Sequence, residues 1–410
     1  MGMIQTFRSV VRLKLPTLRP RQRRLERSVT VEDMRRIARR RLPRGVFDYI
    51  DGGAEDERTM RRNVAGFTGY EFQPRVLRNV SGLDTSVELF GRRASMPVVI
   101  APTGYSRIAH SQGELAVARA AARAGVPYSL STMGTRSIEE VAEAGDGEKW
   151  FQIYTWRDRK LVEDLVARSR EAGYSAVWLT VDTAVLGRRE RDVRHGFLLP
   201  PKIGPSTLID GALHPAWTWD FLTNEPISFA NLTGQAGLDG RTALSLAEKV
   251  KNNFDQSLSW DDIDWLRSIW DGPIVLKGIQ TVADAKQAVA SGVQGIALSN
   301  HGGRQLDDAP VPVDLVEPVR DELGDSATII CDGGIRRGSD IVKALALGAD
   351  AVTIGRPYLY GLGVAGEQGV DHVLSFFRDG LERTMALTGC SSIGDIDRSV
   401  VRRIPPSTAI

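Results

Sequence analysis

Eight short apolar segments recur along this chain, and most are separated by enough residues for one helix. Each is an almost continuous apolar run, which is typical of a parallel strand buried on both faces. Repeated strand-then-helix units predict an α/β fold whose strands close into a (β/α)8 TIM barrel. The predicted strands are residues 97–101, 127–131, 149–154, 176–181, 273–277, 294–298, 327–331 and 350–354, and helical patterns lie at 112–124, 158–172, 282–291 and 338–347.

Two features interrupt this alternation. Residues 31–41 and 44–52 have helical patterns ahead of the first strand, and we expect these N-terminal helices to cap one end of the barrel. A long loop after strand 4 spans about residues 183–258 and contains LHPAWTWDFL. Loops of this length are usually functional or mobile. The aromatic residues Trp217, Trp219 and Phe221 are either part of the core or inserted into a membrane surface.

Charge is unevenly distributed along the chain. Residues 1–30 hold eight Lys and Arg residues against the single acid Glu26, although the net charge of the whole chain is only +2. We therefore divide the chain into a basic N-terminal arm (1–30), the barrel (31–395) and a C-terminal tail (396–410). The arm is either a disordered or surface-draped extension or a segment in contact with an anionic membrane face. Nothing in the overall charge favours a nucleic-acid partner.

The cysteine count and the hydropathy indicate the cellular setting. Cys331 and Cys390 are too few for a disulfide framework and are expected to be reduced, buried thiols. No apolar run is long enough to predict a transmembrane helix. We expect a cytoplasmic protein that is either free or peripheral on the cytoplasmic membrane, and we assign no metal site.

Polar or glycine residues follow every predicted strand, at the end where a barrel carries its active site. Turn chemistry alone supplies Gly, Ser and Asp, but it does not readily supply Lys277, Gln152 or Tyr154. We therefore predict one shared ligand site. Its members are Pro102, Thr103, Gly104, Ser131, Gln152, Tyr154, Thr180, Asp182, Lys277, Ser299, His301, Asp332, Gly333, Gly334, Gly355 and Arg356.

The segment SNHGGRQLD (299–307) is the most informative of these strand ends. A strand that leads into His-Gly-Gly-Arg is poorly explained by packing. His301 can transfer a proton near neutral pH. Arg304 presents a planar fork that fits a carboxylate, and the two glycines allow a ligand to approach the backbone. The segment predicts acid–base chemistry on a small organic acid.

The last two strand ends predict a phosphate site. DGGIRRG (332–338) follows the seventh strand, and Gly-Arg (355–356) follows the eighth. In barrels these two loops bind phosphate through backbone N–H groups and a helix N-terminus. Arg336 and Arg356 would add charge-assisted hydrogen bonds. A phosphate-bearing cofactor is therefore expected, with Lys277 neutralising negative charge on its ring.

A glycine motif further along suggests a different cofactor. Gly361, Gly363 and Gly366 spell GxGxxG, but they do not directly follow a strand and no strand comes after them. A dinucleotide fingerprint requires that βαβ context. We interpret the motif as a turn before the final helix.

From about residue 30 to 395 the chain resembles the FMN-dependent L-2-hydroxy-acid oxidase and dehydrogenase family, which includes glycolate oxidase, lactate oxidase, mandelate dehydrogenase and flavocytochrome b2. The long loop resembles that of bacterial membrane-associated lactate and mandelate dehydrogenases. The strings that carry the resemblance are FDYIDGGAEDE (47–57), APTGYSRIAH (101–110), WFQIY (150–154), LTVDTAVLGRRERD (179–192), SLSWDDIDWL (257–266), LKGI (276–279), SNHGGRQLD, DGGIRRGSDIVKALALGAD (332–350) and IGRP (354–357).

The resemblance implies a catalytic set and a substrate-binding set. His301 would be the base, Asp182 would orient its imidazolium, and Tyr154 would contact the substrate hydroxyl. Arg304 and Arg189 would hold the substrate carboxylate, and Tyr49 would add a hydroxyl. The alternative for Arg188, Arg189 and Arg191 is a solvated basic cluster, in which we favour Arg189 alone as a ligand.

The resemblance also implies an FMN site. Lys277 would face the N1–O2 edge of the flavin, and residues 102–104 would lie beneath its ring. Ser131, Gln152, Thr180 and Ser299 would contact the other edges or the ribityl chain. The ribityl and phosphate groups would be held by Asp332, Gly333, Gly334, Arg336, Gly355 and Arg356.

The implied activity is oxidation of L-lactate, or a similar L-2-hydroxy acid, to the 2-oxo acid, with electrons passed to a quinone or other acceptor. Met133 and Gly104 stand where plant oxidases carry larger residues, which favours the bacterial dehydrogenase pattern. The alternatives are a peroxide-forming oxidase and a mandelate-type dehydrogenase with a larger substrate. A homo-oligomer, specifically a tetramer, is expected from the resemblance alone.

Overall fold

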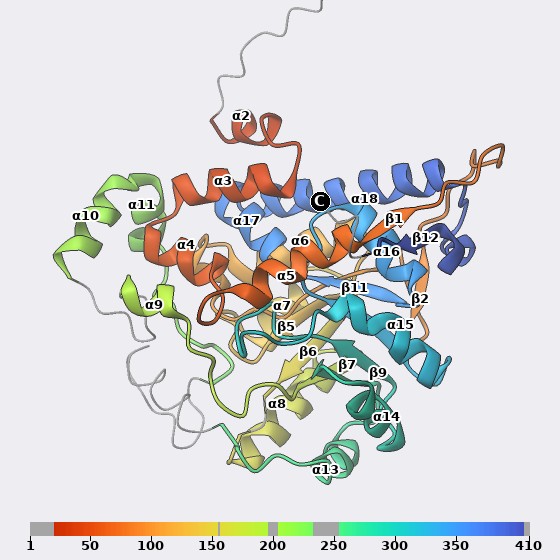
Figure 1. Cartoon of the computed structure of the whole chain (residues 1–410). Helices are drawn as coiled ribbons and strands as arrows, with labels where there is room; N and C mark the ends of the chain where they lie inside the picture. Colours follow the sequence, from red (N-terminus) through yellow and green to blue (C-terminus); the bar gives the residue numbers. More distant parts are fainter. Residues whose placement is uncertain (1–19, 155, 196–203, 233–253, 406–410) are drawn as a thin grey trace, which may run out of the picture.

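The computed structural model describes residues 20–154, 156–195, 204–232 and 254–405 (Figure 1). Eight parallel strands form a closed barrel in the order β10-β11-β4-β5-β6-β7-β8-β9, so the predicted (β/α)8 barrel is confirmed. Each predicted strand agrees with an observed one to within two residues. The strands are β4 (Val98–Ile100), β5 (Tyr128–Ser131), β6 (Lys149–Ile153), β7 (Ala176–Thr180), β8 (Ile274–Ile279), β9 (Gly295–Leu298), β10 (Thr328–Asp332) and β11 (Ala351–Ile354).

Local sequence signals start and end the helices that follow these strands. Ser137 and Glu140 form a reciprocal capping box at the start of α7, and Gly125 ends α6 in the left-handed conformation. The helices are α6 (Gly113–Ala124), α7 (Ile138–Glu143), α8 (Arg159–Glu171), α13 (Asp262–Ile269), α14 (Val282–Ala290), α15 (Pro312–Leu323), α16 (Gly338–Ala346), α17 (Arg356–Ala365) and α18 (Glu367–Thr388).

The interpretation of the GxGxxG motif as a turn was wrong for two of its three glycines. Gly361 and Gly363 lie inside α17, and only Gly366, with φ of +63°, forms the turn before α18. A Cβ atom on Gly361 would lie 2.4 Å from the carbonyl oxygen of Gly369. The motif therefore reflects close packing of α17 on α18, because only glycine lets the two backbones approach so closely.

The inward face of the barrel is divided into an apolar layer and a polar layer. Side chains alternate along a strand, so residues two apart point to the same side. Trp150 and Trp178 belong to an apolar cluster that joins seven barrel strands, and such a cluster can form only inside the barrel. Two residues further along β6 and β7 come Gln152 and Thr180. The interior is therefore filled with apolar side chains towards the amino ends of the strands and is polar towards their carboxyl ends.

Helices and strands that do not belong to the eight strand–helix units cover both ends of the barrel. Residues of α4 line the cavity at the carboxyl ends, whereas Leu89, Phe90 and Ala94 of the β2–β3 hairpin pack on the apolar cluster at the other end. The sequence did not predict this hairpin. The outer elements are α2 (Pro20–Glu26), α3 (Val31–Arg41), α4 (Arg44–Asp51), α5 (Arg58–Gly66), β2 (Val87–Leu89) and β3 (Arg92–Ala94), together with β1 (Tyr70–Phe72), which pairs with β12 (Val401–Arg403).

The long loop contains three described helices, α9 (Glu190–Arg194), α10 (Pro205–Leu213) and α11 (Pro215–Thr223). The last two lie at the periphery, beyond α4 and α9 (Figure 1). Its aromatic residues differ in how they are packed. Trp217 stacks on Phe221 and donates from Nε1 to the carbonyl of Ile108 at 2.8 Å, whereas Trp219 is 72% exposed. None of the helices in the described ranges is long and apolar enough to cross a membrane.

Candidate active site

A cavity of about 500 Å³ lies at the carboxyl ends of the barrel strands. Its volume is within the usual range for small-molecule and cofactor sites. Residues that are distant in the sequence therefore lie together in one place. The predicted residues that line the cavity are Tyr49, Pro102, Thr103, Gly104, Tyr154, Arg189, Lys277, His301, Arg304, Asp332, Gly333, Gly334, Arg336, Gly355 and Arg356.

The other five predicted residues do not line this cavity. Three of them form a buried chain across neighbouring strands, in which Ser131 donates to Gln152 Oε1 at 2.8 Å and Gln152 Nε2 donates to Thr180 Oγ1 at 2.9 Å. The fourth and fifth, Ser299 and Asp182, support lining residues by hydrogen bonds. Direct contact of Ser131, Gln152, Thr180 and Ser299 with a cofactor stays a prediction.

Lys277 brings a buried positive charge to the cavity wall. Its side chain is only 5% exposed, and Nζ lies 3.4 Å from Asp332 Oδ2. Nζ also donates to Ser299 Oγ at 3.1 Å, and Ser299 Oγ in turn donates to Asp332 Oδ2 at 2.7 Å. A buried charge requires such partners. The ammonium is therefore held in place where a ligand can meet it.

His301 and Asp182, which were predicted to be a base and the residue that orients it, are in direct contact. Nδ1 of His301 lies 3.0 Å from Oδ1 of Asp182. A carboxylate can only accept, so Nδ1 carries the hydrogen and the Nε2 lone pair is left to take a proton. His301 adopts a positive φ of +57°, which is uncommon for a residue other than glycine. Gly278 makes room for the pair, because a Cβ atom there would lie 2.7 Å from Asp182 Cγ.

The environment keeps His301 neutral and Asp182 ionised. Burial lowers the pKa of His301, and Lys277 lowers it further, while Asp182 acts in the opposite direction. Burial alone would raise the pKa of Asp182, but the charge and hydrogen bond of His301 hold it below its usual value. A neutral imidazole beside a fixed carboxylate is the state that a general base needs.

The pH dependence of kcat/KM tests this arrangement. Because the pKa of His301 is lowered, its neutral form persists into mildly acidic solution, and we expect the acidic limb below the ordinary histidine value of about 6.5. In Asp182→Asn the carboxylate that raises this pKa is gone, so the limb should move to lower pH while the rate falls. Steady-state pH profiles of both proteins measure the shift. A limb above pH 6.5, or one that does not move, would contradict the assignment.

Two arginines and a tyrosine surround the space in front of His301. Arg304 donates from Nη1 to the carbonyls of Tyr49 and Gly52 at 2.7 and 3.0 Å. The guanidinium carbons of Arg304 and Arg189 lie 5.2 and 5.8 Å from the centre of the Tyr49 ring. Burial and the neighbouring arginines lower the pKa of Arg304 to about 9. Two crowded cations are stabilised when an anionic ligand lies between them.

The residues at the phosphate end fit a bound FMN. Gly333 and Gly334 have φ of +104° and +85°, and a Cβ on Gly334 would lie 1.9 Å from the carbonyl oxygen of Asn63, so this backbone cradle requires glycine. Thr353 lines the same cavity with a buried hydroxyl that has no hydrogen-bond partner among the described residues. An unsatisfied polar atom on a cavity wall is accounted for by a polar ligand.

The two predicted phosphate arginines differ in how they are engaged. Arg356 donates to the carbonyls of Asp51, Gly52 and Gly302. The side chain of Arg336 donates only to the carbonyl of Ile335 among the described residues. Arg336 therefore retains more donors for a phosphate, and Arg356 mainly fixes the loops around it.

Sequence reasoning missed several residues of the cavity wall. Phe229 and Phe254 come from the long loop and give the cavity apolar sides. Asp192 lies 3.5 Å from Arg189 Nε, and burial raises its pKa. Asp192 follows Arg189 by one helical turn, which is a signal that could have been used. The phenylalanines had no such signal, because their positions depend on the path of the loop.

A parallel barrel with a base, a carboxylate clamp, a buried lysine and a glycine cradle defines an α/β-barrel oxidoreductase that binds a phosphate-bearing cofactor. The sequence model of the FMN-dependent dehydrogenase family matches residues 38–403. The chain belongs to this family, so its cofactor is FMN and it is an oxidoreductase of 2-hydroxy acids.

Individual relatives agree with this family over nearly the whole chain. A protein of Mycobacterium tuberculosis named "Putative L-lactate dehydrogenase" is 45% identical over 98% of this chain and 97% of its own length. Glycolate oxidase 1 of Oryza sativa subsp. indica is 43% identical over 90% of this chain and 94% of its own length. The crystal structure of the monotopic membrane protein (S)-mandelate dehydrogenase superposes with a TM-score of 0.89 at 39% identity, covering 92% of this chain and 100% of that one.

Proposed function

We propose that this protein oxidises L-lactate, or a similarly short L-2-hydroxy acid, to the 2-oxo acid and passes the electrons to a quinone or another acceptor. The observation that carries this proposal is that His301 and Arg304 open into the same cavity as Lys277. When bound, FMN supplies the two-electron acceptor that the oxidation needs.

The protein's own residues would act on the substrate as follows. Arg304 and Arg189 hold the carboxylate by charge-assisted hydrogen bonds, and Tyr49 adds its hydroxyl. His301 Nε2 takes the substrate proton, and Asp182 stabilises the imidazolium that results. Tyr154 stays protonated, because burial and then Asp182 raise its pKa, so it can donate to the substrate oxygen.

The cofactor-binding roles follow from the same geometry. Lys277 would stabilise negative charge at one edge of the flavin, with Ser299 and Asp332 holding the ammonium. Residues 102–104 line the cavity beside Met133 and would lie beneath the ring. The glycines 333, 334 and 355 and Arg336 would surround the phosphate.

Two observations support a short acid, and one supports a larger one. The relative named for L-lactate covers the greatest share of this chain among those compared above. Met133, Phe229 and Phe254 also line the cavity with bulky apolar side chains. The alternative, a mandelate-type substrate, is supported by the backbone similarity to (S)-mandelate dehydrogenase. Met133 is unbranched and can move aside for a ring.

Anaerobic mixing of the FMN-loaded protein with L-lactate and, separately, with (S)-mandelate tests the proposal. Loss of the yellow flavin absorbance with lactate at lower concentration than with mandelate is the expected result. Reduction by mandelate alone would replace lactate with the larger acid. Reoxidation is then followed with a soluble quinone and with oxygen, and rapid peroxide formation without any reaction with quinone would favour an oxidase instead.

We also propose that α10 and α11 attach the protein to the cytoplasmic membrane. α11 is anchored through Asp220, which accepts two hydrogen bonds from Ser111. The two helices carry apolar side chains that are 62–74% exposed, namely Leu208, Ile209, Leu213, Trp219 and Leu222. Exposed apolar residues, together with a basic helix such as α2, fit an anionic lipid surface. The basic arm 1–30 would add attraction, although residues 1–19 lie outside the described part of the chain.

Charged substitutions on this surface should release the protein from membranes. In the double variant Trp219→Glu and Leu222→Glu, two exposed apolar contacts become repulsive towards anionic lipid, so we expect most of the protein in the supernatant after sedimentation with anionic vesicles. Leu387→Glu is the matched control, because Leu387 is equally exposed on α18. Equal sedimentation of both variants would remove the proposal.

The tetramer is proposed from family resemblance and is measured by light scattering.

A further inference from the structure

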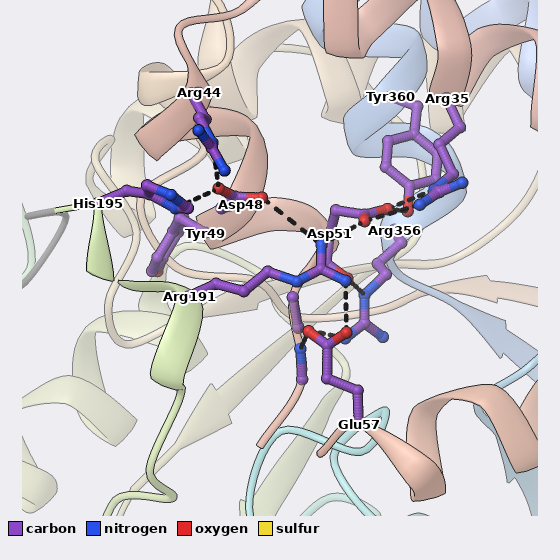
Figure 2. A network of polar contacts seen from close by, with 12 residues as sticks. Arg35, Arg44, Asp48, Tyr49, Asp51, Glu57, Arg191, His195, Arg356 and Tyr360 are labelled. Carbon is purple, nitrogen blue, oxygen red and sulfur yellow. Dashed lines mark hydrogen bonds and ion pairs between the residues drawn. The ribbon is translucent and has the colours of Figure 1, made fainter. Parts of the chain in front are cut away.

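Arg191 is the centre of a buried ionic network beside the cavity (Figure 2). Its Nη1 lies 3.0 Å from Asp51 Oδ2 and 3.5 Å from Asp48 Oδ1, and its Nη2 contacts Glu57 Oε2. The three carboxylates are only 2%, 10% and 10% exposed. The sequence-based alternative of a solvated basic cluster is therefore wrong for Arg191, because its position next to these distant acids was not visible in the sequence.

The acids that hold Arg191 are themselves fixed from several directions. Asp51 accepts hydrogen bonds from Nε and Nη2 of Arg35 at 2.5 and 2.9 Å. It also accepts a hydrogen bond from the hydroxyl of Tyr360 at 2.7 Å. Glu57 Oε1 accepts the backbone N–H of Gly53 at 2.9 Å. Buried ion pairs with several hydrogen bonds impose one geometry on the groups they join. The carboxylates therefore offer Arg191 a rigid anchor rather than a flexible one.

The segment that carries these acids also holds two arginines of the cavity. Carbonyl oxygens of Tyr49 and Gly52 accept from Arg304, and those of Asp51 and Gly52 accept from Arg356. Residues 48–57 thus hold Arg304 and Arg356 through backbone carbonyls, and they hold Arg191 through side chains. One rigid segment sets the relative positions of all of them.

Arg189 lacks comparable support of its own. Its Nε lies 3.5 Å from Asp192 of α9, the short helix for which Arg189 is the N-cap, and its guanidinium lies over the ring of Tyr49. α9 has only five residues, and a helix so short is not stable by itself. The carbonyl of Arg188 accepts from Glu55 N at 2.9 Å, which gives α9 a second tie to the same segment. The conformation of Arg189 therefore depends on what anchors α9.

We propose that Arg191, through Asp51 and Glu57, is the positioning residue that docks α9 and places Arg189 to bind the substrate carboxylate. Arg191 lines a separate basic cavity with Arg35 and Arg194, and it is not among the residues of the substrate cavity. Arg191 therefore acts on the substrate only through Arg189. The inference rests on the proposed carboxylate-binding role of Arg189.

The test compares Arg191→Gln and Arg191→Lys with Arg194→Gln in the FMN-loaded protein. Arg194 is on the same helix but is 67% exposed and pairs only with Glu190 among the described residues, so it is a matched control. Loss of position should weaken one charged contact by about 1.4 kcal/mol, which raises KM about tenfold with kcat nearly unchanged. Lys should restore part of the affinity, since it keeps the charge but cannot reach two acids as a fork does.

A double variant separates positioning from general destabilisation. If Arg191 acts through Arg189, then Arg189→Met with Arg191→Gln should have the same KM as Arg189→Met alone. Flavin content and melting temperature are measured in parallel. Multiplied effects on KM, or a KM in Arg191→Gln equal to that of Arg194→Gln, would overturn the inference. If Arg189→Met itself leaves KM unchanged, the proposed role of Arg189 fails instead.

Discussion

Replacing His301 with Gln is expected to lower the rate of flavin reduction by about 10²–10⁴-fold, the contribution of a positioned general base. Glutamine fills a similar space but cannot accept a proton at neutral pH. The buried lysine and the glycine cradle are unchanged by this substitution, so FMN should remain bound. Stopped-flow mixing with the substrate under anaerobic conditions measures the rate, and the visible spectrum measures the flavin content.

A matched His→Gln change elsewhere guards against a general effect. His372 contacts the carbonyls of Leu25 and Ser28 and is not among the residues that line the cavity, so His372→Gln should reduce flavin at the wild-type rate. Unchanged turnover in His301→Gln would refute its role as the base. Loss of FMN from that variant would instead place His301 in cofactor binding.

Arg304→Lys is expected to lower kcat/KM by about 10–150-fold, because a charged hydrogen bond contributes about 1.5–3 kcal/mol. Nη1 of Arg304 already bonds the carbonyls of Tyr49 and Gly52, and the rest of the planar fork faces the cavity. A lysine ammonium is a single point of charge and cannot serve the carbonyls and a carboxylate together. Substrate affinity should therefore fall even though the positive charge is kept.

Steady-state kinetics separate binding from chemistry in this variant. A rise in KM with little change in kcat indicates lost ground-state binding, and an equal fall in kcat and kcat/KM indicates a contact made only in the transition state. Arg123→Lys, which changes an exposed pair with Asp371, is the control. The assignment is wrong if kcat/KM of Arg304→Lys equals that of the control.

The residues that the strand-end pattern predicted share one property. Lys277, His301 and Asp332 lie at or near the carboxyl ends of their strands, and these ends meet in a parallel barrel whatever the intervening loops do. Periodicity locates a strand, and the fold rule then locates the site. This is why chemistry at the ends of several strands could be predicted together.

The residues that it missed depend on contacts between distant, irregular segments. Arg191 meets Asp51 across 140 residues of chain, and no local pattern marks that pairing. Phe229 and Phe254 enter the cavity from the long loop, whose path is set by packing rather than by period. The β2–β3 hairpin is only a few residues long on each side, which is too short for alternation to distinguish it from a turn.

The two tryptophans inside the barrel provide a spectroscopic reporter of barrel closure. The rings of Trp150 and Trp178 lie 5.8 Å apart at 33°, on strands that adjoin only in the folded sheet. Coupled indoles held in a fixed orientation give near-ultraviolet circular dichroism, which disappears when packing is lost even if helices remain. Thermal melts followed by near-ultraviolet circular dichroism would report on the packing of β6 and β7. Flavin absorbance would report on the cofactor site at the carboxyl ends of the strands. A difference between the two melting temperatures would show that the cofactor site opens before the barrel strands unfold.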